Sequence, residues 1–350
     1  MASGPARDRR NGTTLEEVAL LAGVSRATVS RVVNGSPRVS PDIRREVQNA
    51  IAELGYVPNR AARSLVTGRT GSIGVVIAEP TGRLFSDPFF PRLLRGVSGV
   101  LSARDFQLVL LMPGSAEDAK RTGHYLAAGH VDGVVMVSLH GQDPLPSLLL
   151  GADIPLVVVG RPPSGVAASF VDVDNRQGAR SAVEHLVAGG RRVIATIAGP
   201  ADMPVGIDRL AGYCEALTES GLTFDPRLVV HGDFTQSGGS DGIRRLLSAR
   251  RDIDGVFAAS DLMAAGALAG LLAAGRQVPA DVAVVGYDDS PVATSTNPQL
   301  TSVHQPIEEM GLEAARLLID AIDTSDRPKR RVILATDLVK RASSSGRPSP

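Results

Sequence analysis

The sequence lacks tryptophan and contains a single cysteine, Cys214, among its 350 residues. One cysteine excludes an intrachain disulfide, which fits a reducing cytoplasm. No apolar run approaches the roughly 18 residues that a bilayer crossing requires. No apolar stretch follows the charged residues Arg7–Arg10 either, so a secretory signal is not expected. We therefore expect a cytoplasmic protein that does not enter a membrane.

Several signatures of catalysis are also missing. The only lysines, Lys120, Lys329 and Lys340, lack the preceding Gly and following Ser or Thr of a phosphate-binding loop. The six histidines are scattered, and no pair has the spacing of metal ligands. Cys214 lies in a helical stretch and suits a small buried side chain better than a nucleophile. The sequence therefore predicts neither an enzyme nor a bound cofactor or metal.

Charge is distributed unevenly along the chain, although its net value is +0. Residues 1–70 contain eleven Arg and six acidic residues, a balance of +5, and the remaining residues carry −5. A basic end on an acidic body is expected when only that end contacts phosphate groups.

Residues 14–34 have the pattern of a helix-turn-helix. Apolar residues recur at helical spacing in the first half, and Gly23 permits a left-handed turn. Ser25 is a suitable N-cap for a second helix, whose outer face would carry Arg26 and Arg31. Two short helices joined by a tight turn, the second with exposed Arg and Thr, suit the major groove of DNA.

The rest of the N-terminal region divides into short segments. Residues 1–12 are polar and expected to be disordered, and a third helix should run from Ser40-Pro41 to about Leu54. An extended connector at 56–59 and a short helix at 60–66 should follow. The helix-turn-helix domain is therefore predicted to span residues 13–58.

Beyond Gly71, short apolar strands alternate with helices, which predicts parallel sheets covered on both faces. The number of units exceeds one core, so two similar doubly wound α/β lobes are expected across residues 71–342. The expected strands are 73–78, 107–112, 133–137, 156–159, 193–197, 228–231, 255–258 and 282–286. The expected helices are 89–103, 116–128, 176–188, 208–220, 236–248, 261–274 and 307–322. A hairpin at 331–340 and a disordered tail at 343–350 complete the prediction.

Sequence blocks along most of the chain resemble the lac-repressor/galactose-repressor family of bacterial transcription regulators. The blocks are residues 14–34, 39–41, 54–60, 72–76, 87–90, 159–161, 173–175, 198–200, 209–212, 260–261, 285–289 and 300–306. The resemblance implies an all-α DNA-binding headpiece, a hinge helix at 59–68, and a dimeric core like that of periplasmic sugar-binding proteins. Within the family, the sequence looks most like the cellobiose-responsive repressors of actinomycetes.

By this resemblance, the start of the second helix reads DNA bases. Arg26 and Arg31 could each donate two hydrogen bonds to guanine, whereas Ala27 could only touch a thymine methyl group. Thr28, Ser30 and Asn34 suit phosphate contacts, which set register. The alternative for each arginine is a solvated surface charge. The other residues expected to contact DNA are Thr14, Ser25, Tyr56, Asn59, Arg60, Arg63 and Leu65.

Leu65 is the residue that the family uses as a wedge in the minor groove, which unstacks a base step at a cost of about a few kcal/mol. The alternative is that Leu65 packs on Ala61 or on the core. Because seven residues cannot form a stable isolated helix, we expect the hinge helix to be disordered without DNA. Two hinge helices packed together would require a nearly palindromic operator.

The family also implies a sugar effector between the two lobes, where strands present their carboxyl ends. The residues expected to bind it are Phe89, Arg161, Asp174, Arg209, Phe234, Ser260, Asp261 and Asp288. Alternatives exist for some: Asp261 and Asp174-Asn175 could cap helices, and Phe90 suits the core better than the pocket. Arg209 and Asp288 are the strongest candidates because burying either charge alone is costly.

The sequence features discriminate among four functions. An effector-controlled repressor, released from its operator by a sugar such as cellobiose or another oligosaccharide, fits every feature. A co-repressor-activated regulator of the same family differs only in the sign of the ligand effect. A sugar-binding transport protein would need a signal peptide and no basic headpiece, and an enzyme has no supporting motif. The expected partners are operator DNA, a sugar and a second copy of the chain.

Overall fold

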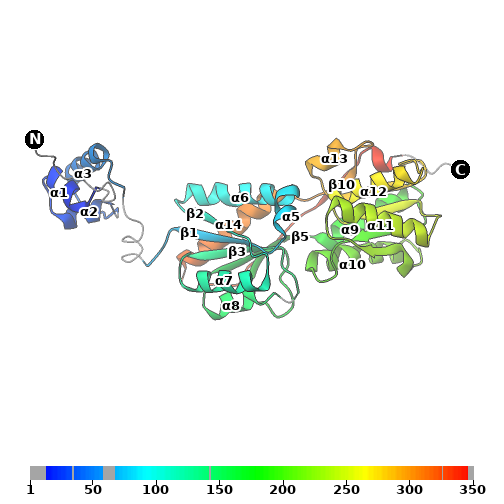
Figure 1. Ribbon diagram of the computed structural model, residues 1–350, viewed down its shortest axis with the longest axis horizontal. Coiled ribbons are helices and arrows are strands. Elements are labelled where there is room, and N and C mark those ends of the chain that lie inside the picture. Colours follow the sequence, from blue (N-terminus) through cyan, green and yellow to red (C-terminus); the bar gives the residue numbers. More distant parts are fainter. Residues whose placement is uncertain (1–12, 34, 58–67, 142, 325, 346–350) are drawn as a thin grey trace, which may run out of the picture. The chain divides into compact units, whose positions relative to one another are not determined.

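The computed structural model describes residues 13–33, 35–57, 68–141, 143–324 and 326–345. These residues fall into two compact units that divide between Thr70 and Gly71 (Figure 1). The N-terminal unit is the headpiece and the C-terminal unit is the core. Among the described residues, no helix has both the length and the apolar character needed to cross a membrane.

The headpiece contains the predicted helix-turn-helix. Its helices are α1 (Leu15–Leu21), α2 (Arg26–Val33) and α3 (Pro41–Leu54). Thr14 and Glu17 form a capping box at the start of α1, and Gly23 has a φ of 63° in the turn. Val18, Val29 and Val47, one from each helix, are fully buried against one another in the headpiece core. This small apolar centre fixes the angle at which α2 is presented.

The core consists of two lobes, each built on a six-stranded sheet. The sheet of the first lobe has the order β11-β5-β4-β3-β1-β2, and that of the second has the order β12-β10-β9-β8-β6-β7. All neighbours are parallel except β10 and β12. The first sheet comprises β1 (Ser72–Ile77), β2 (Gln107–Leu111), β3 (Gly133–Val137), β4 (Leu156–Val159), β5 (Ser169–Val173) and β11 (Arg331–Leu334). The second comprises β6 (Ile194–Ala198), β7 (Val229–His231), β8 (Gly255–Ala258), β9 (Ala283–Asp288), β10 (Thr301–His304) and β12 (Asp337–Val339).

Helices cover both faces of each sheet, as the apolar strands require. In the first lobe α6 and α14 pack on one face and α7 and α8 on the other (Figure 1). In the second lobe α11 and α12 cover one face and α9 and α10 the other. The bounds are α5 (Thr81–Ser86), α6 (Phe89–Ala103), α7 (Ala116–Ala127), α8 (Leu145–Gly151), α9 (Asn175–Ala188), α10 (Pro204–Glu219), α11 (Gln236–Ala249), α12 (Asp261–Ala273), α13 (Pro291–Ser295) and α14 (Ile307–Asp323).

Close backbone approach holds α6 against α14. A Cβ atom on Gly96 would lie 2.0 Å from the carbonyl oxygen of Glu308, and one on Gly311 would lie 2.3 Å from that of Leu93. Glycine is therefore required at both positions. This contact ties α14, which follows the second lobe in sequence, to the first lobe.

The sequence prediction was wrong about several features of the core, and it also missed the short helices α5, α8 and α13. Strands β5 and β10 were missed, because polar side chains interrupt their apolar runs. The predicted hairpin at 331–340 does not form. Its two halves enter different sheets, β11 beside β5 and β12 beside β10, so this segment is a crossing between lobes.

The prediction of a disordered tail at 343–350 is also wrong for residues 343–345, and residues 346–350 lie outside the described residues. Ser343 and Ser344 are buried, and residues Ala342–Ser344 form a short 3-10 helix against β9 and β10. The Ser343 hydroxyl donates to the carbonyl of Val284 at 2.6 Å and accepts from the Thr301 backbone N–H at 2.8 Å. Composition suggested disorder, but small hydroxyl side chains can satisfy buried backbone groups at a sheet end.

We predict that deleting residues 341–350 lowers the free energy of unfolding, because backbone groups of Val284 and Thr301 then lose their partners. Each buried group left unpaired costs about 1–3 kcal/mol. Urea denaturation followed by circular dichroism would measure the change. Deleting only residues 346–350 is the control and should leave the midpoint unchanged; equal midpoints for both deletions would contradict the structural role of Ser343 and Ser344.

Candidate functional site

The exposed surface of α2 carries the residues expected to read DNA. Arg26, Ala27 and Arg31 are exposed, and Thr28 and Ser30 are half-buried. The Ser25 hydroxyl accepts a hydrogen bond from the Thr28 backbone N–H at 3.1 Å, which confirms its predicted capping role. Arg26 pairs with Glu16 of α1 at 2.8 Å, with both side chains largely in solvent. Such an exposed pair is weak and leaves the guanidinium available to a stronger anion.

Some of the predicted DNA-binding residues do not belong to this exposed surface of α2. Tyr56 is only 9% exposed and packs in the headpiece core, and its contact with DNA stays a prediction. Its ring extends the apolar cluster of the headpiece. The candidates Asn34, Asn59, Arg60, Arg63 and Leu65, and with them the predicted hinge helix, lie outside the described residues.

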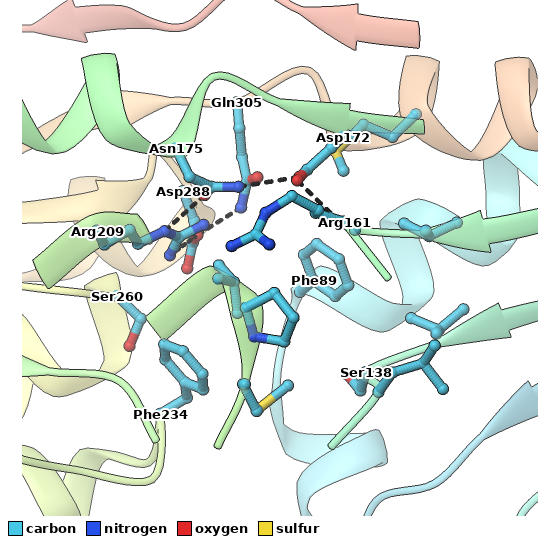
Figure 2. Close-up of a pocket in the computed structure, with 18 of the residues that line it drawn as sticks. Phe89, Ser138, Arg161, Asp172, Asn175, Arg209, Phe234, Ser260, Asp288 and Gln305 are labelled. Atoms are coloured by element: carbon cyan, nitrogen blue, oxygen red, sulfur yellow. Dashed lines mark hydrogen bonds and ion pairs between the residues drawn. The ribbon is translucent and has the colours of Figure 1, made fainter. Parts of the chain in front are cut away.

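The core contains a pocket between its two lobes, with about 90 Å³ open to the centres of water-sized molecules and about 710 Å³ when the open solvent at its mouth is counted. Loops at the carboxyl ends of strands from both sheets line it, as expected for parallel α/β sheets. Figure 2 shows Arg161, Asp172 and Phe89 of the first lobe facing Arg209, Ser260 and Phe234 of the second. Of the eight residues predicted to bind an effector, six line this pocket: Phe89, Arg161, Arg209, Phe234, Ser260 and Asp288.

Arg209 is the central charged group of the pocket and is only 4% exposed. Its Nε donates to Asn175 Oδ1 at 2.8 Å, and one Nη donates to the Ala259 carbonyl at 2.6 Å and lies 3.5 Å from Asp288 Oδ1. The guanidinium also stacks 3.5 Å over the ring of Tyr287. These contacts hold it rigidly in one orientation at the pocket wall.

Asp288 is the acidic member of this charge cluster, and its backbone has an unusual conformation. Its φ is 107°, a value that non-glycine residues rarely adopt. Gln305 Nε2 donates to Asp288 Oδ1 at 2.6 Å, which fixes the carboxylate toward Arg209 (Figure 2). An unusual backbone conformation held by polar partners is typical of ligand-binding positions.

Burial changes the acidity of the pocket carboxyl groups. Desolvation raises the pKa of Asp172 to about 6, although the backbone N–H groups of Val173 and Arg161 oppose the shift. Desolvation likewise raises the pKa of Asp288 well above its usual value, with Arg209 acting in the opposite direction. It also raises the pKa of Asp87, opposed by the Phe89 N–H and by Arg83. A polar ligand that donates hydroxyl hydrogens would replace the water these groups lack.

Two phenyl rings stand among the apolar residues that line the pocket. Phe89 begins α6 in the first lobe, and Phe234 follows β7 in the second with a φ of 63°. The Phe234 ring approaches Gly199 so closely that a Cβ there would lie 2.4 Å from it, and Arg83 lies 5.0 Å above its centroid. Two fixed rings among charged groups suit a ligand with both C–H faces and hydroxyl groups.

Two predicted effector residues do not line the pocket. Asp174 is exposed, and its side chain caps α9 by accepting from the Gln177 N–H at 2.9 Å. Asp261 is fully buried, where it accepts from the Ser302 hydroxyl at 2.6 Å and the Ser290 N–H at 2.7 Å. Both are therefore corrected to structural residues. Capping of α12 falls to Ser260, whose hydroxyl accepts from the Met263 N–H.

Sequence reasoning missed several polar residues that line the pocket: Arg83, Asp87, Asp172, Asn175 and Gln305. Asp172 and Gln305 belong to or follow the two strands that were missed, so recognising β5 and β10 would have placed them. Asp87 was within a recognised block, and Asn175 was considered only as a cap. No sequence signal marked Arg83, which lies on the short helix α5.

A histidine at the side of the cleft joins the two lobes. His140, after β3, places Nδ1 2.7 Å from Asp202 Oδ2 of the second lobe and Nε2 3.7 Å from Glu79 Oε1 of the first. The Glu79 and Asp202 carboxylates raise the pKa of His140 to about 9, against the opposing effect of partial burial. The imidazole is therefore charged at neutral pH.

A helix-turn-helix unit and a two-lobed core with a charged cleft, joined in one chain, define a DNA-binding regulator that responds to a small ligand. Residues 14–59 match the family model for bacterial regulatory proteins of the lacI family, and residues 183–344 match that for a periplasmic binding protein-like domain. The chain is 52% identical over 339 residues to the HTH-type transcriptional regulator CelR of Thermobifida fusca, covering 96% of this chain and 99% of that one. It is 35% identical over 332 residues to the ribose operon repressor of Escherichia coli, covering 94% and 99%.

Solved structures agree with these relationships. A CelR–cellobiose complex superposes with a TM-score of 0.77 at 50% identity, covering 95% of this chain and 99% of that one. The lac repressor dimer bound to operator and the anti-inducer ONPF superposes with a TM-score of 0.84 at 29% identity, with the same coverage. The chain belongs to the lacI family of bacterial regulatory proteins. It is a transcriptional regulator and not an enzyme, as the sequence predicted.

We predict that Arg209→Ala lowers the free energy of unfolding by about 3–5 kcal/mol, because it leaves a buried charge cluster without its cation. Arg316→Ala is the control, since Arg316 is an exposed partner of Glu313 and its loss should change stability by less than about 0.5 kcal/mol. Urea titrations of both variants would measure this. Equal small losses would contradict the central role of Arg209.

We also predict that the His140 imidazole titrates near pH 9, since its pKa is raised to about 9. A group whose pKa is raised by folding stabilises the fold most below its unfolded pKa, about 6.5, and this contribution disappears as the pH rises through 9. Heteronuclear NMR of the ring would follow the titration. Asp202→Asn should shift the midpoint downward; a midpoint near 6.5 in the unaltered chain would contradict the assignment.

Proposed function

We propose that this regulator represses sugar-utilisation genes and leaves a pseudo-palindromic operator when cellobiose, or another oligosaccharide, binds in the pocket. The observation that carries the proposal is the pocket itself, in which charged hydrogen-bonding groups and two phenyl rings converge from both lobes. The relative CelR, 50% identical in its solved structure, forms a complex with cellobiose.

The polar groups suit a neutral sugar. Carboxylates and amides such as Asp87, Asp288 and Asn175 accept or donate hydrogen bonds to vicinal hydroxyls, and Arg209 donates only. Phe89 and Phe234 offer faces for sugar C–H groups. No net charge on the ligand is needed, because Arg209 already pairs with Asp288 at 3.5 Å.

On the DNA side, we propose that α2 lies in the major groove. Arg31 and Arg26 would reach base edges, and Ala27 would contact a thymine methyl. Thr14, Ser25, Thr28 and Ser30 would contact phosphates, which set register. The positive balance of residues 1–70 supports attraction to the backbone.

A homodimer is part of the proposal. One helix-turn-helix unit contacts only a half-site, so two copies related by a twofold axis would read a palindrome. The related lac repressor was solved as a dimer on its operator.

Release requires that the sugar bind the DNA-free conformation more tightly than the DNA-bound one. Equal affinity for both would shift nothing. A cleft between two lobes meets this condition physically, because a ligand that contacts both lobes favours one interlobe arrangement. The same arrangement would set the spacing of the two headpieces.

We expect Arg31→Ala to weaken binding to a palindrome selected from random DNA by about 1–3 kcal/mol, the value of one bidentate base contact. Fluorescence anisotropy at several salt concentrations would measure it, and Gln48→Ala on the exposed side of α3 is a neutral control. Cellobiose should weaken operator binding of the unaltered chain. Tighter binding with cellobiose would instead indicate a co-repressor, and no preference for any palindrome would contradict the proposal.

A further inference from the structure

A bidentate ion pair joins the two lobes across the cleft. Arg161, in the loop after β4, belongs to the first lobe, and Asp208, on α10, belongs to the second. Arg161 Nε donates to Asp208 Oδ2 at 2.9 Å, and one Nη donates to Oδ1 at 2.8 Å. Two parallel bonds between a guanidinium and a carboxylate are the strongest geometry such a pair can adopt. Asp208 has no role in the site described so far.

Both ends of this pair are held by the same buried network. The Arg161 backbone N–H donates to Asp172 Oδ2 at 2.9 Å, and Asp172 Oδ1 accepts from Asn175 Nδ2 at 2.9 Å (Figure 2). Asn175 Oδ1 in turn accepts from Nε of Arg209, which follows Asp208 directly on α10. The contacts therefore form a closed ring that starts and ends at Arg161 and passes through both lobes.

The ring restricts what Arg161 does in the pocket. Arg161 lines the pocket, but the forked side of its guanidinium, with Nε and one Nη, is occupied by Asp208. A neutral sugar offers no anion with which Asp208 could be exchanged. In addition, the two side chains are 41% and 25% exposed, so water can solvate both ions when the lobes separate. The pair can therefore open reversibly.

We infer that the Arg161–Asp208 pair holds the two lobes in the closed arrangement, so that Arg161 acts on effector affinity through Asp208 and not by contacting the effector. The inference deepens the function proposed above and rests on it for the identity of the ligand. Arg161 and Asp208 are positioning residues in this account. A sugar bound between Phe89, Arg209 and Phe234 would be retained by closure of the lobes around it.

A charge exchange distinguishes closure from direct contact. Arg161→Asp and Asp208→Arg each place like charges opposite one another, and the double variant restores an opposite pair with its direction reversed. We expect each single variant to weaken cellobiose binding by roughly 3- to 10-fold, as suits a partly exposed pair of good geometry. The double variant should recover most of the loss. Isothermal titration calorimetry on the full chain measures all three.

Arg244→Asp is the matched control. Arg244 forms an ion pair with Asp241 on α11, so the same substitution breaks a pair within one lobe. Cellobiose affinity should not change in this variant. If Arg161 contacts the sugar directly, the double variant will bind no better than Arg161→Asp, and the inference is overturned.

Amide hydrogen exchange on the unliganded full chain gives a reading that does not depend on the sugar. Each single variant should raise exchange in both residues 160–164 and residues 202–208, although only one segment carries the change, and the double variant should restore protection in both. A chain that shows this pattern but does not bind cellobiose would refute the proposed effector and retain the closure role. A chain that binds cellobiose normally, with exchange unchanged in all variants, would refute the closure role and retain the effector.

Discussion

The cation of Arg209, buried between Asn175, Asp288 and the Ala259 carbonyl, is the interaction on which the rest of the core depends. A guanidinium at 4% exposure is tolerable only where carboxylate, amide and carbonyl oxygens surround it. Those oxygens come from α9, from the end of β8 and from the end of β9. Satisfying one charge therefore fixes the relative positions of three elements at the cleft.

The same constraint extends to the first lobe. The Asn175 side-chain amide donates a hydrogen bond to Asp172 of β5. Asp172 in turn accepts a hydrogen bond from the backbone N–H of Arg161. Asp172 and Asn175 lie where the chain passes from one sheet to the other. A ligand that contacts Arg209 or Asp288 would therefore act on groups that are hydrogen-bonded to this crossing segment. The rings of Phe89 and Phe234, one from each lobe, line the same pocket. A regulator needs differential contact between two arrangements.

Much of this could be predicted from the sequence, and the failures have physical causes. The helix-turn-helix was predictable because Gly23, Ser25 and the buried valines are local signals. Strands with uninterrupted apolar runs, such as β3 and β4, were predicted to the residue. Strands β5 and β10 carry Asp172 and Ser302 in positions where only tertiary partners explain a polar side chain. The local pattern of apolar residues therefore could not indicate these two strands.

The predictions of the site residues succeeded and failed for the same physical reasons. Arg209 and Asp288 could be proposed because a buried charge requires a partner, and the structure brings them together. Asp174 and Asp261 share the chemistry of ligand contacts, but their oxygens bind backbone and hydroxyl groups of the protein. Arg83 and Asp208 reach the cleft from helices whose positions depend on long-range packing. Which acidic residues face the cavity is a property of the fold and not of the local sequence.

The central claim is that one cleft and one DNA surface are energetically coupled, and thermodynamic reciprocity tests it most directly. Cellobiose affinity should be measured by calorimetry on the free chain and on the chain saturated with its selected palindrome. We expect cellobiose to bind the DNA-bound chain more weakly, by the same factor by which cellobiose weakens DNA binding. Equal cellobiose affinity for both forms would contradict it.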